Sequence, residues 1–187
     1  MREASDVTGS FVAPDAGVVV GSDLLLAVAA LAYRGPTRTA IARLKYAGAV
    51  QVAGPLAEIA SPTLARLTEV SGAGTVVPVP IHVERLRQRG YNQAALLARH
   101  LARISGLPMD EVLERRTVTE RQHRLDRASR MHNLRGAIRL RAGVAAPVVA
   151  ILVDDILTTS ATLEACASVL RVAGAREVYG LAIAREV

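Results

Sequence analysis

Two adjacent carboxylates, Asp154 and Asp155, follow a run of apolar, largely β-branched residues at 147–153, and a hydroxyl-rich segment at 158–160 comes shortly after them. Backbone N–H groups and the dipole at a helix N-terminus attract an anion, and hydroxyl groups add donors to a phosphate. Carboxylates would repel that phosphate, but they suit ribose hydroxyls or a hydrated Mg²⁺. The combination predicts a sugar-phosphate site. The alternative is that the carboxylates only solvate a strand end and the hydroxyls only cap a helix.

The elements around this segment predict how it is positioned. The run 147–153 is typical of a strand buried on both faces of a parallel sheet, with the carboxylates at its end. An Ala/Leu-rich helix is expected over 162–172 and a final strand over 177–184, which together form a right-handed βαβ unit. Ligands of open α/β sheets bind beyond the carboxyl ends of the strands, and we expect the carboxylates there.

A second block resembles the first in organisation. A short β-rich run at 75–80 leads into a polar segment that we expect to be a loop, and a helix is predicted over 91–104. The loop carries Arg85, Arg89 and Gly90. Arginine forks can bind pyrophosphate, and glycine permits a close backbone approach. The alternative is a solvated basic surface.

The N-terminal third of the sequence is expected to form a hairpin and two helices. Residues 18–20 and 24–33 are expected to form a hairpin and Thr37 to cap a helix. A further helix is expected to cover 50–67, interrupted or kinked near Pro62. Lys45 and Tyr46, on the first of these helices, either reach the acceptor side of the site or serve packing.

The predicted fold is α/β, with a central, mainly parallel sheet and helices on both faces. We expect an N-terminal hood at 1–72 to cover the strand ends and residues 73–187 to form the core, within a single compact unit.

Composition restricts the remaining possibilities. The net charge is +6, and nine arginines between 115 and 141 face only two acids, a local balance of +7. One Phe, four Tyr and no Trp offer little for stacking single-stranded nucleic acid, although a nucleic-acid patch remains an alternative for this basic stretch. The one cysteine, Cys166, is expected to be a core thiol in a reducing compartment, so we expect a cytoplasmic protein. The best apolar run, 24–32, is too short for a membrane span.

The segment 153–162 resembles the 5-phosphoribosyl-1-pyrophosphate (PRPP) motif of type I phosphoribosyltransferases. That resemblance implies that Asp154 and Asp155 hold the ribose hydroxyls and Mg²⁺. It also implies that the 5-phosphate is wrapped by Thr158, Thr159, Ser160, Ala161 and Thr162. Ser160 stands where the family usually has glycine, and a left-handed backbone there would cost serine about 1 kcal/mol.

The string at 78–93 closely resembles the ComF family, also called GntX-like, whose members look like relatives of amidophosphoribosyltransferase. The resemblance extends to Leu44-Lys45-Tyr46 and covers roughly residues 30–185. It implies a pyrophosphate loop formed by His82, Arg85, Arg89 and Gly90. It further implies a flexible loop that closes over PRPP and contains Arg116, Gln122 and Arg130.

The resemblance implies an enzyme that transfers the phosphoribosyl group from PRPP, with Mg²⁺, to an unknown acceptor that is expected to be nitrogen. No residue stands out as a general base. The family usually carries a four-cysteine zinc element, which is absent here, so no zinc is expected. The alternative is a non-catalytic module that binds PRPP, nucleotides or DNA in competence-related DNA uptake. A homodimer is common for this fold.

Overall fold

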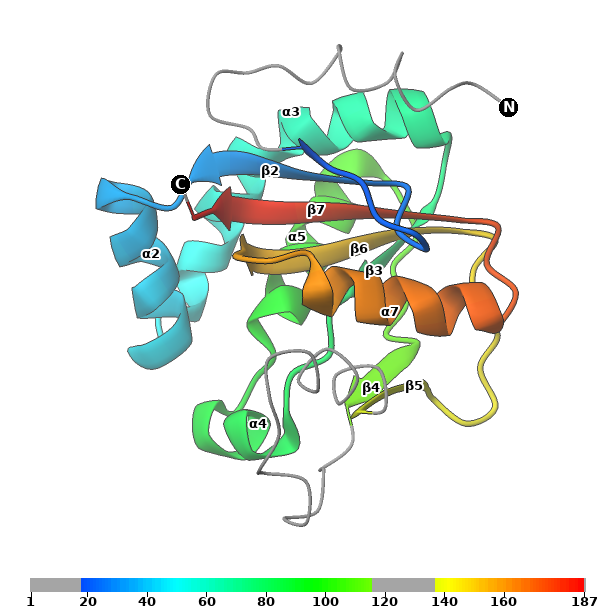
Figure 1. The fold of residues 1–187 in the computed structure, drawn as a ribbon. Coiled ribbons are helices and arrows are strands. Elements are labelled where there is room, and N and C mark those ends of the chain that lie inside the picture. Colours follow the sequence, from blue (N-terminus) through cyan, green and yellow to red (C-terminus); the bar gives the residue numbers. More distant parts are fainter. Residues whose placement is uncertain (1–17, 116–136, 187) are drawn as a thin grey trace.

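The computed structural model describes residues 18–115 and 137–186; residues 1–17, 116–136 and 187 are not described. Within the described part, a five-stranded sheet has the order β1–β2–β7–β6–β3. All neighbouring strands in it are parallel except the antiparallel pair β1–β2. The strands are β1 (Val18–Val19), β2 (Leu26–Ala32), β3 (Thr75–Pro78), β6 (Val149–Leu157) and β7 (Glu177–Arg185). Figure 1 shows β2 and β7 running side by side toward the same edge.

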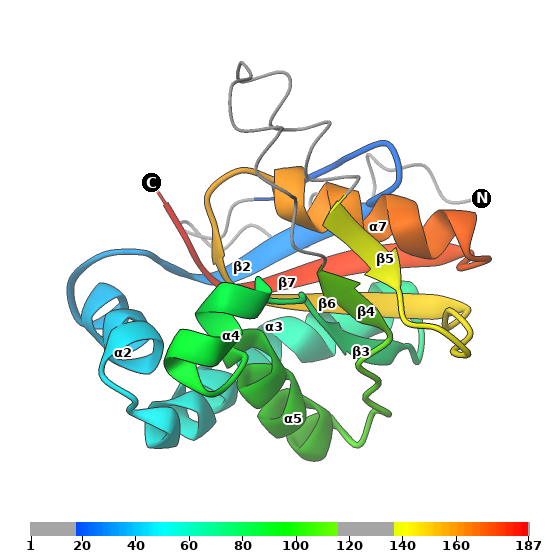
Figure 2. The same cartoon turned by 90° about the horizontal axis from the view of Figure 1, so that it is seen from below.

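Helices cover both faces of this sheet (Figures 1 and 2). One face packs on α3 (Ala53–Ser71) and α5 (Gln93–Ser105), and the other on α7 (Ala161–Val172). Strand residues alternate between the two layers, since Ile151 belongs to the first hydrophobic cluster and Leu152 to the second. The predicted α/β fold with a mainly parallel sheet is therefore confirmed.

The remaining elements lie around the carboxyl edge and the α7 side. They are α2 (Gly35–Tyr46), the 3-10 turn η2 (Val50–Val52), α4 (Val83–Arg89), and a separate two-stranded ribbon of β4 (Leu113–Arg115) and β5 (Ile138–Leu140). No helix in the described part of the chain combines the length and apolar character that crossing a bilayer requires.

The N-terminal segment contributes to the central sheet as well as to its edge. The predicted hairpin forms, with Val19 opposite Ala27, and β2 also joins β7 in parallel, with Val28 opposite Leu181. Helix α2 extends beyond the carboxyl ends of the strands (Figure 1). A hood at 1–72 separate from a core at 73–187 remains a prediction, with β2 and α3 lying in the same hydrophobic core as the later strands.

Two local predictions were wrong at the carboxyl edge. The polar segment after β3 contains a helix, α4, rather than only a loop, because His82 caps its start and Gly90 ends it in a left-handed conformation. Strand β6 continues to Leu157 instead of ending before the carboxylates, because β7 pairs with it as far as Arg185.

One prediction about a helix end was also wrong, and one about a helix break was wrong in part. Helix α2 begins at Gly35 with Pro36 in its first turn, so Thr37 lies inside the helix. Of the interruption or kink expected near Pro62, the interruption is absent, because helix α3 is continuous through this residue. Proline cannot donate to the carbonyl of Glu58, and the Ser61 hydroxyl donates to that oxygen instead at 2.8 Å.

Candidate functional site

The acid pair lies near the carboxyl end of β6, which leads into the start of α7 (Figure 2). Asp155 is only 4% exposed and Asp154 is half-buried. Consecutive strand residues point to opposite faces, so Asp154 faces the α7 side and Asp155 the α2 side. The Asp155 N–H donates to Asp154 Oδ1 at 2.8 Å. Burial and the neighbouring Asp155 carboxylate hold the pKa of Asp154 well above its ordinary range.

Lys45 is the cation that faces this pair. Its Nζ lies 2.8 Å from Asp155 Oδ2, and its side chain is 17% exposed. Helix α2 is held in place beside the site because the Tyr91 hydroxyl, just before α5, donates to the Leu44 carbonyl. Lys45 therefore lies beside the acid pair, and its predicted reach to the acceptor side stays a prediction.

The hydroxyl-rich turn follows β6 directly. Thr158 and Thr159 are exposed, and Ser160, Ala161 and Thr162 are half-buried at the start of α7. Ser160 has φ −68° and ψ −4°, a right-handed conformation that serine adopts without strain, so the conformational cost considered for this position does not arise. Its side chain makes no capping hydrogen bond. The first-turn N–H groups of α7 thus remain free of a side-chain cap at this position and face the carboxyl edge.

The predicted pyrophosphate-loop residues lie on α4 and its two ends. His82 Nδ1 accepts a hydrogen bond from the Glu84 N–H at 3.3 Å and so serves as a helix cap. Gly90 has φ +80°, and its N–H donates to the Leu86 carbonyl at 2.8 Å. This left-handed turn explains the glycine without any close approach by a ligand.

Arg85 and Arg89 line a cavity of about 390 Å³, which we call the basic pocket, together with Lys45, Tyr46 and Gln88. Arg89 lies over the ring of Tyr46, 5.1 Å from its centroid. The described lining holds three cations and no carboxylate, which suits an anion. The basic pocket touches the acid pair through Lys45.

Arg115, at the end of β4, adds a further cation on the Asp154 side. Its Nε is buried and makes no hydrogen bond within the described part of the structure. Burial and the Arg85 guanidinium lower the pKa of Arg115, while the charge of Asp154 opposes that shift. The sequence indicated Arg115 only as the first residue of the arginine-rich stretch at 115–141. The loop residues Arg116, Gln122 and Arg130 lie outside the described residues.

Cys166 is fully buried in α7 beside these charges, as expected for a core thiol. Burial and the charge of Asp154 raise its pKa. It is therefore a poor nucleophile.

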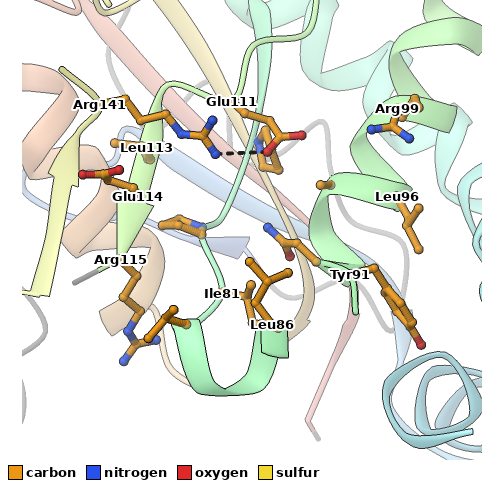
Figure 3. A pocket seen from close by; sticks show the side chains of 15 residues that line it. Ile81, Leu86, Tyr91, Leu96, Arg99, Glu111, Leu113, Glu114, Arg115 and Arg141 are labelled. Atoms are coloured by element: carbon orange, nitrogen blue, oxygen red, sulfur yellow. Dashed lines mark hydrogen bonds and ion pairs between the residues drawn. The ribbon is translucent and has the colours of Figure 1, made fainter. Parts of the chain in front are cut away.

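A second cavity, of about 420 Å³, lies between α4, α5 and β4 (Figure 3). Its walls are largely apolar, with Ile81, Leu86 and Leu96 among them, and its rim carries an ion pair in which Arg141 Nη2 lies 3.2 Å from Glu111 Oε2. Arg115 is the lining residue that also belongs to the surroundings of the acid pair. The predicted sugar-phosphate residues do not line this cavity.

Glu164, in the first turn of α7, is a buried carboxylate that sequence reasoning missed. It accepts hydrogen bonds from the N–H groups of Ser22, Asp23 and Leu24 at 2.8–3.3 Å and from the Ser22 hydroxyl at 2.6 Å. Burial alone would raise the pKa of Glu164, but these donors outweigh it and the net pKa lies below the ordinary value. Gly21 is needed beside it, because a Cβ at that position would lie 2.0 Å from Glu164 Oε2.

The carboxylates of Asp154 and Asp155 fit a Mg²⁺ ion that is bound together with a phosphate-containing ligand. Among the described residues, no group of three or more His, Cys, Asp or Glu side chains is arranged to hold a metal. Two carboxylates alone suit Mg²⁺ that keeps water and phosphate oxygens among its ligands.

No family model matches this chain. It is 36% identical over 118 residues to competence protein F of Haemophilus influenzae, which covers 57% of this chain and 49% of that protein. It is 31% identical over 150 residues to the DNA utilization protein YhgH of Salmonella typhimurium, covering 78% of this chain and 66% of that protein. The chain thus spans between about half and two thirds of the length of these relatives.

Among solved structures, the allosteric regulatory enzyme of purine biosynthesis is 22% identical, with a TM-score of 0.44 over 71% of this chain and 26% of that chain.

Proposed function

Because the chain belongs to the ComF family, the family of competence protein F, we propose that it binds PRPP at the carboxyl edge of its sheet and transfers the phosphoribosyl group to a nitrogen acceptor. In this reaction the bond between C1 of the ribose and the pyrophosphate oxygen breaks, and its electron pair leaves with pyrophosphate. The acceptor nitrogen forms the new bond to C1 and loses a proton to solvent.

The observation that carries the proposal is the juxtaposition of three chemically distinct groups at one edge. The buried pair Asp154–Asp155 suits ribose hydroxyls, the turn at 158–162 with the N-terminus of α7 suits a phosphate, and the basic pocket suits a second anion. A ribose with a phosphate at one end and pyrophosphate at the other has this distribution of charge. A strand end that merely needs solvation would not require Asp155 to be 4% exposed.

The chain's own residues would act by positioning and by charge stabilisation. The transition state is expected to resemble an oxocarbenium ion, with positive charge growing on the ribose and negative charge on pyrophosphate. In this proposal Asp154 and Asp155, on the two sides of β6, would hold ribose hydroxyls, and Arg85 and Arg89 would hold pyrophosphate. Mg²⁺ would be held by the two carboxylates and the ligand. When bound, it would neutralise part of the negative charge on pyrophosphate.

Calorimetry with PRPP and Mg²⁺, followed by pyrophosphate release over a panel of amine and nucleobase acceptors, tests the proposal. We expect stoichiometric binding that depends on Mg²⁺ and release with at least one acceptor. No heat at millimolar PRPP would contradict both binding and transfer. Binding without release from any acceptor would leave a ligand-binding module.

Such a module is the second candidate, and the names of the relatives favour it. Competence protein F and DNA utilization protein YhgH are named for DNA-related processes rather than for a transfer reaction. Under this candidate the chain binds DNA or a nucleotide without turnover, using its arginine-rich stretch at 115–141. DNA binding would weaken steeply with salt as counterions are released, whereas PRPP binding would saturate at one site.

A further inference from the structure

Lys45 is in an unusual position for a cation of an anion-binding pocket. In the structure its ammonium lies 2.8 Å from Asp155, yet its side chain also lines the basic pocket with Arg85 and Arg89. It therefore stands between the carboxylates that would take the ribose and the guanidinium groups that would take pyrophosphate. It is also the only lysine in the sequence.

The acid pair needs this cation while the site is empty. Two adjacent carboxylates repel each other, and Asp155 is buried, with the Lys45 ammonium 2.8 Å from its Oδ2. A buried carboxylate without a partner destabilises the folded protein, so Lys45 compensates the charge of Asp155 when no ligand does. Once ribose hydroxyls and Mg²⁺ bind Asp155, they satisfy its carboxylate, and the ion pair with Lys45 is no longer needed.

Helix α2 is built to hold Lys45 at this boundary. The Tyr91 hydroxyl donates to the Leu44 carbonyl, and the Tyr46 ring lies under Arg89. Both contacts fix the helix end against the α4–α5 segment without using the ammonium. A lysine side chain has a flexible four-carbon stem and a compact charge, so it can turn from one partner to another while its backbone stays in place.

We propose that Lys45 is a positioning residue that exchanges partners: it neutralises Asp155 in the empty site and transfers its ammonium to a pyrophosphate oxygen in the basic pocket when ribose and Mg²⁺ occupy Asp155. This inference rests on the proposed function. It assigns a role in ligand binding to a helix outside the two motifs that carry the sequence resemblance to the PRPP site.

The proposal predicts effects of opposite sign for Lys45→Met. Mg²⁺ alone should bind the variant about 10-fold more tightly than the wild type, because the ammonium no longer competes for Asp155. PRPP with Mg²⁺ should bind about 10-fold more weakly, because one pyrophosphate contact is lost. Arg43→Met is the matched control, since Arg43 is an exposed cation on the same helix, and it should leave both affinities within 2-fold. A purely structural role for Lys45 would weaken both affinities together, and that result would overturn the proposal.

A second measurement needs no variant at Lys45. Protein grown with lysine labelled with ¹⁵N at Nζ contains a single ammonium signal in NMR, because the chain has one lysine. In the free protein this signal should exchange slowly with water, move in Asp155→Asn, and stay in place in the exposed control Asp110→Asn. A signal that ignores Asp155→Asn would overturn the ion pair on which the proposal depends.

Two ligands then separate the partner exchange from the proposed function. PRPP with Mg²⁺ should move the signal to a new position with slow exchange, while ribose 5-phosphate with Mg²⁺, which lacks pyrophosphate, should release the ammonium to water and broaden the signal. If calorimetry shows PRPP binding and the signal stays unmoved, the exchange is wrong and the proposed function stands. If calorimetry shows no PRPP binding, the proposed function fails and the exchange fails with it.

Discussion

Glu164 and the pair Asp154–Asp155 lie on consecutive elements, α7 and β6, and the protein surrounds them differently. Glu164 receives three backbone N–H groups and one hydroxyl, and its pKa falls below the ordinary value. Among the described residues, the pair receives one backbone N–H and an ion pair with Lys45, and Asp155 Oδ2 has no hydrogen-bond partner. The pKa of Asp154 rises. Within this part of the chain the fold itself satisfies the first carboxylate, whereas the second site is left short of donors.

This difference separates a structural carboxylate from a candidate ligand site. A fully hydrogen-bonded buried carboxylate stabilises the folded state, because its charged form is better solvated there than in the unfolded chain. A raised pKa means the reverse: holding Asp154 charged at neutral pH costs folding stability. Perturbed pKa values of this kind cluster at functional sites, where a ligand supplies the missing partners.

The largest expected effect is that of Asp154→Asn on ligand binding. Asparagine keeps the shape and removes the charge, so PRPP affinity should fall by about 2–5 kcal/mol, as for other buried charged contacts. Folding stability at pH 7 should stay constant or rise, since the raised pKa of Asp154 shows that its charge is unfavourable. Calorimetry and urea unfolding measure the two effects. Asp110→Asn is the exposed control, and a large loss of stability in Asp154→Asn would place this residue with Glu164 instead.

Glu164→Gln should have the opposite profile. Loss of a charged acceptor of four hydrogen bonds should cost about 1–3 kcal/mol of stability at pH 7, with PRPP affinity nearly unchanged. Because the folded-state pKa is lowered, the contribution is present above the ordinary value of 4.5 and is lost as pH falls through the folded-state pKa. The stability difference between wild type and variant should therefore shrink below about pH 4.5. Glu58→Gln, at an exposed position, should show no such pH dependence.

Gly21→Ala tests the structural role of Glu164 by changing the residue that lies against its carboxylate. The added methyl would lie 2.0 Å from Glu164 Oε2, so the carboxylate must move away from its donors, at a cost of about 1–2 kcal/mol. In a Glu164→Ala background the same change should cost much less, because the clashing group is gone. Urea unfolding of the four proteins in this double-mutant cycle measures the coupling. Additive costs would contradict the assigned contact.

Ser160→Gly should have the smallest effect. Ser160 already has right-handed backbone angles and its side chain caps nothing, so glycine should change stability by only a few tenths of a kcal/mol. PRPP affinity should remain within about 2-fold of wild type. A large gain in affinity, measured by calorimetry, would show that serine at this position hinders the phosphate turn.

The sequence predicted those parts of the fold and site that depend on local pattern. The apolar run before Asp154 indicated a buried strand, and the periodicity after Ser160 indicated a helix; both elements are present. The contacts that decide the roles of the carboxylates are different in kind. Lys45 meets Asp155, and Glu164 meets Ser22 across 142 positions of the chain, and no spacing rule within a segment encodes such pairs.

Helix α4 shows a second limit. Five of its seven residues are polar or charged and none has a buried side chain, so hydrophobic periodicity gives little signal. The cap by His82 and the left-handed Gly90 hold it, and both residues had been interpreted only as ligand contacts. The extension of β6 past the carboxylates was missed for a related reason, because pairing with β7 outweighs the polar character of two residues.

The most direct test of the contrast between these carboxylates is urea unfolding of three proteins, with and without PRPP and Mg²⁺. At a ligand concentration 100 times Kd, the wild type should gain about 2.7 kcal/mol. Glu164→Gln should start from lower stability and gain the same increment, while Asp154→Asn should start at or above wild-type stability and gain almost nothing. Equal stabilisation of Asp154→Asn and wild type by PRPP would contradict the account.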